Sequence, residues 1–116
     1  MKIVINTCYG GFSLSKEAGK WLLNNGIEEP FKSKIQRRIN EMGGSNFILA
    51  DLEEHSNRTH PLLVKCVETL GKRASGEYAK LEIEEVSGDY YRIDEYDGIE
   101  SVITPELDYF LENKYK

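Results

Sequence analysis

The residues between positions 6 and 15 combine groups that can hold a phosphate with aromatic rings that can stack on a base. Gly10 and Gly11 lie in a loop between an apolar segment and a helix that Ser15 can cap. Glycine lets a backbone approach a ligand closely, and the free amides of a helix N-terminus suit a phosphate or a carboxylate. We therefore predict a ligand-binding loop, with these residues in contact with the ligand: Asn6, Cys8, Tyr9, Gly10, Gly11, Phe12 and Ser13.

The same loop has a structural interpretation, in which it is a tight turn and the rings of Tyr9 and Phe12 belong to the core. The loop lacks the lysine of a P-loop, and its glycines do not follow the GxGxxG pattern of dinucleotide-binding proteins. Binding sites nevertheless lie preferentially where strands end, and this favours a ligand there. Both interpretations remain open at the level of the sequence.

Cys8 is also a candidate nucleophile, because a thiol near a helix N-terminus can be activated as a thiolate. The two histidines that would serve as its base, His55 and His60, lie far away in the sequence, and no nucleophile signature surrounds Cys8. Free cysteines are usually buried, which favours a structural role. We therefore predict a protein that binds rather than an enzyme, with a small hydrolase using Cys8 or His60 as the alternative.

The stretch 51–60 gathers acidic and basic side chains with both histidines of the chain. Its spacing fits no HExxH frame, and two cysteines and two histidines without paired spacing do not form a zinc pattern. We expect no metal and no cofactor. Arg58 and His60 approach the N-terminus of the helix that Pro61 begins, and we predict that they contribute to binding the anion.

Hydrophobic periodicity predicts the elements that must position these residues. We expect a strand at 2–6, a helix at 16–25, a helix from 31 to 42, a short strand at 47–50, a helix from 61 that ends before 76, three strands between 79 and 103, and a last helix at 106–113. The predicted fold is one α+β domain covering residues 1–116. Three to four helices cover a small, mostly antiparallel sheet, which joins the N-terminal strand to a C-terminal three-strand meander.

Charge and composition narrow the partners of the protein. The net charge of −5 divides into +3 over residues 1–50 and −8 over residues 51–116. The acidic half argues against duplex nucleic acid, whose binding depends on neutralising phosphates. No apolar run is long enough for a membrane span or a signal peptide, and two distant cysteines indicate reduced thiols. We expect a cytoplasmic protein that forms a homo-oligomer and has neither a membrane nor a nucleic acid as its partner.

Two blocks of sequence resemble a family of small bacteriophage and prophage proteins that have no assigned function. The first block is MKIVINTCYGGFSLS at residues 1–15. The second includes RTHPLLV at 58–64, CVETLG at 66–71, ASG at 74–76 and YDGIE at 96–100. The resemblance implies a phage origin and a location in the bacterial cytoplasm.

Small accessory proteins of phages often counter host defence, and some withhold nucleotide signals of the immune system. By analogy with that setting, our leading hypothesis is a protein that sequesters a small phosphorylated ligand, either a cyclic nucleotide signal or an ADP-ribose derivative. An interaction protein that inhibits a host factor is a further alternative. Its binding surface would be the stretch 82–100, which holds eight acidic residues and one arginine.

Overall fold

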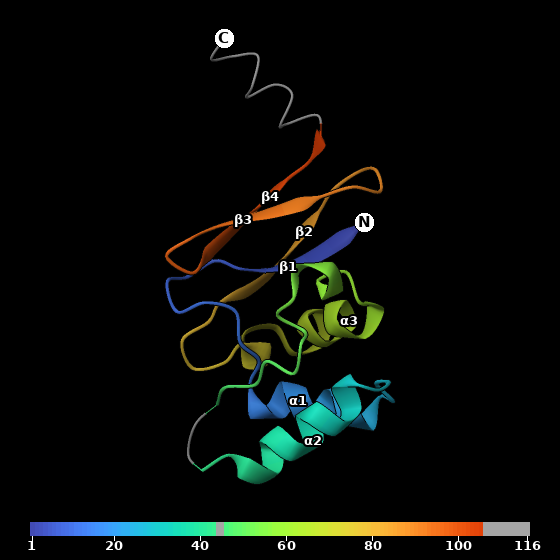
Figure 1. The fold of residues 1–116 in the computed structure, drawn as a ribbon, viewed down its shortest axis with the longest axis vertical. Coiled ribbons are helices and arrows are strands. Elements are labelled where there is room, and N and C mark those ends of the chain that lie inside the picture. Colours follow the sequence, from blue (N-terminus) through green and yellow to red (C-terminus); the bar gives the residue numbers. More distant parts are fainter. Residues whose placement is uncertain (44–45, 106–116) are drawn as a thin grey trace.

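The computed structural model describes residues 1–43 and 46–105 and has the α+β fold that the sequence predicts (Figure 1). Its elements are, in order, β1 (Lys2–Asn6), α1 (Lys16–Asn24), α2 (Phe31–Glu41), the 3-10 helix η1 (His55–Asn57), α3 (Pro61–Leu70), the 3-10 helix η2 (Gly71–Ala74), β2 (Leu81–Glu85), β3 (Arg92–Tyr96) and β4 (Ile99–Ile103). No helix in this part of the chain is long and apolar enough to span a membrane. The expected helix at 106–113 lies outside the described residues.

The helices begin where their capping residues predict. The Ser15 hydroxyl accepts a hydrogen bond of 3.0 Å from the amide of Ala18, which caps α1. Pro61 is the first residue of α3, and Nδ1 of His60 accepts a hydrogen bond of 3.1 Å from the amide of Leu62. Sequence-local signals are therefore sufficient to place the starts of these two helices.

The strands pair differently from the expected meander, which is matched only roughly. β3 and β4 form the predicted hairpin, and its turn contains Asp97 and Gly98 with φ angles of 51° and 85°. β2 pairs antiparallel with β1, so the described residues form two sheets of two strands each. The expected strand at 47–50 is reduced to a single bridge between Ile48 and Leu14.

β1 separates two hydrophobic cores, because its side chains alternate between two buried faces. Val4 faces the core that the helices form with β2. Ile3 and Ile5 face the other way and pack with Ile93 and Val102 of the hairpin. The hairpin consequently covers the face of β1–β2 opposite the helices instead of extending the sheet at its edge (Figure 1).

Candidate ligand-binding groove

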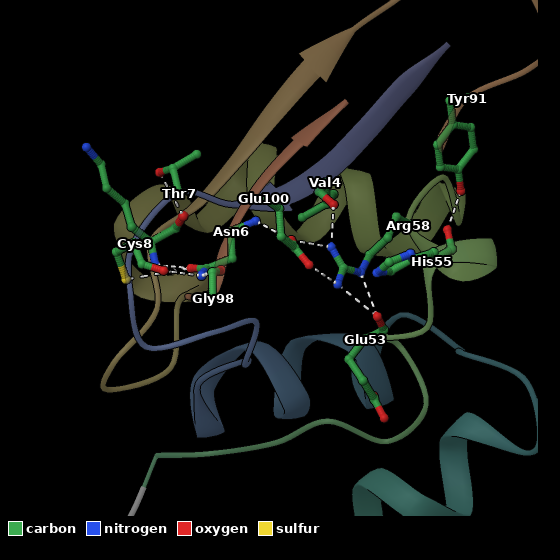
Figure 2. Close-up of polar contacts among 11 residues, drawn as sticks. Val4, Asn6, Thr7, Cys8, Glu53, His55, Arg58, Tyr91, Gly98 and Glu100 are labelled. Carbon is green, nitrogen blue, oxygen red and sulfur yellow. Dashed lines mark hydrogen bonds and ion pairs between the residues drawn. The ribbon is translucent and has the colours of Figure 1, made fainter. Parts of the chain in front are cut away.

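Arg58 and Glu100 form a buried ion pair (Figure 2). Their relative exposures are only 1% and 6%. Arg58 donates to Glu100 at 2.6 Å and 2.7 Å, to the carbonyl of Val4 at 3.1 Å, and to the carbonyl of Glu53 at 2.8 Å and 3.0 Å. These five hydrogen bonds match the five N–H donors of a guanidinium group. Arg58 is fully used inside the protein and has no donor left for a ligand in this structure.

The same pair closes the outer edge of β1. The amide of Val4 donates to the backbone carbonyl of Arg58 at 2.9 Å, while the Val4 carbonyl accepts from the Arg58 side chain. Two residues further along, the amide of Asn6 donates to the Glu100 carboxylate at 2.7 Å. Buried backbone groups need partners, and a strand edge normally finds them in another strand. Here an arginine and a glutamate take the place of that strand.

The side chain of Asn6 fixes the predicted ligand-binding loop in position. Its Nδ2 donates to the carbonyls of Cys8 at 2.6 Å and of Gly98 at 2.7 Å. Its Oδ1 accepts from the amide of Lys80 at 2.8 Å. Asn6 is completely buried and therefore ties the loop both to the start of β2 and to the turn of the hairpin.

The glycines of the loop allow close packing against the protein's own backbone. A Cβ atom on Gly10 would overlap the carbonyl oxygen of Tyr78, and one on Gly98 would lie 2.7 Å from the amide nitrogen of Gly11. Gly11 has a φ of 82°, a conformation that side chains disfavour. The close approach predicted for a ligand is thus made here by other segments of the chain.

The remaining loop residues divide between the core and the surface. Phe12 is buried, with the Arg58 guanidinium carbon 4.0 Å from the centre of its ring. Ser13 is also buried, and its hydroxyl has no hydrogen-bond partner among the described residues. The ring of Tyr9 is 75% exposed, and Tyr78, whose carbonyl accepts from the Cys8 thiol at 2.9 Å, is 65% exposed. Tyr9 is therefore the loop's exposed aromatic ring.

His60 and Cys8 do not contact one another. The Nε2 atom of His60 lies 2.8 Å from the Glu28 carboxylate, and Nδ1 caps α3, so both ring nitrogens have partners within the protein. The Cys8 thiol contacts the Tyr78 carbonyl and lies 3.7 Å from Oδ1 of Asn6. The other cysteine, Cys66, is buried, and this burial raises the pKa of its thiol to about 12. The structure therefore provides no contact between a cysteine and a histidine base within the described residues.

The described residues form a groove of about 880 Å³ between β2 and the C-terminal end of α3. Cys8 is the loop residue that reaches it. The groove combines apolar side chains with two lysines, one hydroxyl and one carboxylate, and its lining is Cys8, Val67, Gly71, Lys72, Ser75, Ala79, Lys80, Leu81, Glu82 and Ile83. This size and this mixture are typical of small-molecule sites.

The two lysines of the groove differ in their surroundings. Lys80 lies 3.6 Å from the Glu82 carboxylate. Lys72 follows the end of α3 and lies in η2, and Glu68, four residues before it, pairs with Lys2 at 2.8 Å. Lys72 has no ion-pair partner in the part of the chain that the structure describes. Neither lysine has a local sequence signal, because the groove forms only where η2 meets β2.

Two of the four basic residues of α2 already have partners within the protein. Lys34 forms an ion pair with Asp51, and Arg38 donates to the carbonyl of Phe47 at 3.0 Å. Among the described residues, Glu100, His55 and Glu95 form a group of possible metal ligands. Their potential ligand atoms all lie within 4.8 Å of one another. Both oxygens of Glu100 already bind Arg58, so this cluster does not indicate a metal site.

Comparison with known proteins finds no match for this chain. The chain matches no protein-family model, and neither a curated protein nor a solved structure is similar enough to count as a match. The geometry of the groove and of the segments that form it is therefore the basis on which a function is inferred.

The buried ion pair predicts large and coupled effects on stability. Arg58→Met leaves the Glu100 carboxylate buried without its partner, and we expect a loss of about 3–5 kcal/mol in the free energy of unfolding. The double variant Arg58→Met/Glu100→Gln should lose less than the sum of the two single variants, since no uncompensated charge remains. Urea denaturation measures the free energy of unfolding of the two single variants and of the double variant.

Arg73→Met, which breaks the exposed pair of Arg73 with Glu17, is the control and should change the free energy of unfolding little. Equal losses for Arg58→Met and Arg73→Met would contradict the structural role of Arg58.

Glu53 predicts a dependence of stability on pH. Its Oε2 atom is buried without a hydrogen-bond partner among the described residues, and this burial raises the pKa of the carboxyl above its ordinary value of 4.5. The folded state therefore holds the proton more tightly than the unfolded state does. The resulting stabilisation is present below the unfolded pKa and is lost as the pH rises through the folded pKa.

Glu53→Gln removes this titration while keeping the shape of the side chain and the backbone carbonyl that Arg58 binds. We expect its advantage in unfolding free energy over the parent protein to grow between about pH 4 and about pH 7. Glu54→Gln, at the neighbouring exposed residue, is the control variant. Denaturation curves across this range test the prediction, and an advantage that shrinks toward neutral pH would contradict it.

Proposed function

We propose that the protein binds a small phosphorylated ligand in the groove between β2 and the end of α3, and sequesters it without changing it chemically. The observation that carries this proposal is the combination of an apolar lining with Lys72 and Lys80 in one groove of about 880 Å³. Apolar walls suit the uncharged part of a ligand, and ammonium groups suit a phosphate. The loop beginning at Asn6 contributes Cys8 to the same groove.

The surroundings of the groove support binding over catalysis. The Cys8 thiol contacts the carbonyl of Tyr78 and the side chain of Asn6, and His60 is engaged with Glu28. A hydrolase using Cys8 would require a base within hydrogen-bonding reach of the thiol. The resemblance to phage proteins adds a biological setting to this proposal, in which the ligand is a nucleotide signal of bacterial immunity and the protein acts against host defence.

Calorimetric titration with cyclic dinucleotides and ADP-ribose derivatives tests the proposed function. We expect the parent protein to bind at least one of these compounds, and heat denaturation to release it unchanged. Lys72→Gln and Lys80→Gln should each weaken binding by about tenfold or more, because each removes a hydrogen bond to a charged group.

Lys65→Gln is a matched control, because Lys65 is an exposed lysine of α3 outside the lining of the groove. It should bind as the parent protein does. The proposal fails if the parent binds none of the compounds, or if the Lys72 and Lys80 variants bind as tightly as the control. Release of a chemically altered compound would instead favour the hydrolase alternative.

A further inference from the structure

The hydrogen-bond pattern of β1 and β2 determines which backbone groups of β2 face outward. The amide of Thr7 donates to the carbonyl of Lys80 at 2.8 Å, and the amide of Val86 donates to the carbonyl of Met1 at 2.9 Å. Residues of an antiparallel strand alternate between pointing toward one neighbour and toward the opposite side. With even-numbered β2 residues bonded to β1, the N–H and C=O groups of Leu81, Ile83 and Glu85 point away from it.

The outward edge of β2 is closed at one end and open inside the groove. The amide of Leu81 donates to the Ser75 hydroxyl at 2.9 Å. Ile83 is the next outward residue, and it lines the groove. Within residues 1–43 and 46–105, no strand pairs with this edge, and no backbone hydrogen bond reaches Ile83 from that side. Ile83 therefore presents an unpaired N–H group and an unpaired C=O group side by side at the groove, next to the outward carbonyl of Leu81.

We infer, building on the proposed function, that the ligand carries a flat heterocyclic ring whose edge pairs with the N–H and C=O groups of Ile83. A nucleobase presents a neighbouring acceptor and donor on its edge, which complements this pair. The ring faces would contact the apolar side chains of Val67 and Leu81, while Lys72 and Lys80 hold the phosphate. The inferred ligand class is thus a nucleotide rather than a sugar phosphate or inorganic phosphate.

A small ring fits the open segment better than a peptide strand does. A strand added to β2 would need successive outward groups, and Ser75 already occupies the amide of Leu81. A ring needs only the pair on Ile83. The charges of the exposed residues Glu82 and Glu84 lie along the strand and would further restrict an added peptide to basic sequences.

The first experiment changes the ligand and leaves the protein intact. The probes are adenosine monophosphate, ribose phosphate, and an adenosine monophosphate whose exocyclic amine carries two methyl groups. We expect the methylated compound and ribose phosphate to bind about tenfold more weakly than adenosine monophosphate, since each lacks the donor that meets the Ile83 carbonyl. Guanosine, cytidine and uridine monophosphates extend the series with other base edges.

The second experiment changes the backbone donor. Ile83→Pro removes the outward N–H group without removing a hydrogen bond to β1, and proline is tolerated at such edge positions. Ile83→Ala controls for the loss of the side chain, and Glu85→Pro places the same change at an outward residue outside the groove. We expect Ile83→Pro alone to lose the preference for adenosine monophosphate over ribose phosphate. Circular dichroism and thermal melting check that each variant folds. If Ile83→Pro does not fold, the ligand series of the first experiment alone tests the base recognition.

The outcomes separate this inference from the proposed function. Binding of all probes with equal affinity, still dependent on Lys72 and Lys80, would overturn the base recognition and leave the phosphate-binding groove in place. The same holds if folded Ile83→Pro keeps the preference of the parent protein. Absence of binding by every nucleotide and by ribose phosphate would overturn both. A basic peptide could instead displace bound adenosine monophosphate, and do so only from proteins with an intact Ile83 amide. That result would show that the outward edge of β2 recognises a peptide strand and not a base.

Discussion

The buried pair of Arg58 and Glu100 is the interaction on which the other parts of the structure depend. Two charges removed from water are tolerated only when their hydrogen-bonding groups have partners, and here all the guanidinium donors do. Because those partners come from β1, from the segment before η1 and from β4, the pair joins parts of the chain that are distant in sequence. It also completes the edge of β1, the strand that both cores share.

The groove follows from this arrangement in a few steps. Glu100 receives the amide of Asn6, and the Asn6 side chain holds the carbonyls of Cys8 and Gly98 and the amide of Lys80. These contacts fix where the loop leaves β1 and where β2 begins. Cys8 and Lys80 consequently lie in the lining of one groove although 72 positions separate them in the numbering of the chain. The Asn6 side chain, which lies outside the lining of the groove, thus contributes to the shape of the groove.

The parts of the fold that depend on neighbouring residues could be predicted from the sequence. Ser15 and Pro61 mark helix starts, and Asp97-Gly98 marks a hairpin turn, because these residues act on the backbone beside them. The separation of the β3–β4 hairpin from β2 could not be read in this way. It depends on Ile93 and Val102 of the hairpin packing on Ile3 and Ile5 of β1, which are distant from them in the sequence.

In the candidate site, too, features that depend on neighbouring residues could be predicted, and features that depend on distant contacts could not. Its loop was recognisable from its glycines and aromatic residues, and Cys8 does line the groove. Arg58 was recognisable as a cation that needs an anion, but the anion is Glu100, 42 positions away, and no local pattern joins the two. Lys72 and Lys80 gave no signal because one follows a helix and the other precedes a strand. Only the packing of η2 beside β2 brings them together.

Native mass spectrometry of the protein purified from bacterial cells that contain its ligand shows whether the groove holds a small molecule. We expect a mass that exceeds the mass of the 13.3 kDa chain, or of its oligomer, by the mass of a small phosphorylated molecule. Heat should release this molecule unchanged, and the Lys72→Gln/Lys80→Gln variant should lack it while the Lys65→Gln variant retains it. A spectrum of bare polypeptide under these conditions, or an adduct that persists without both groove lysines, would contradict a ligand-binding role for the groove.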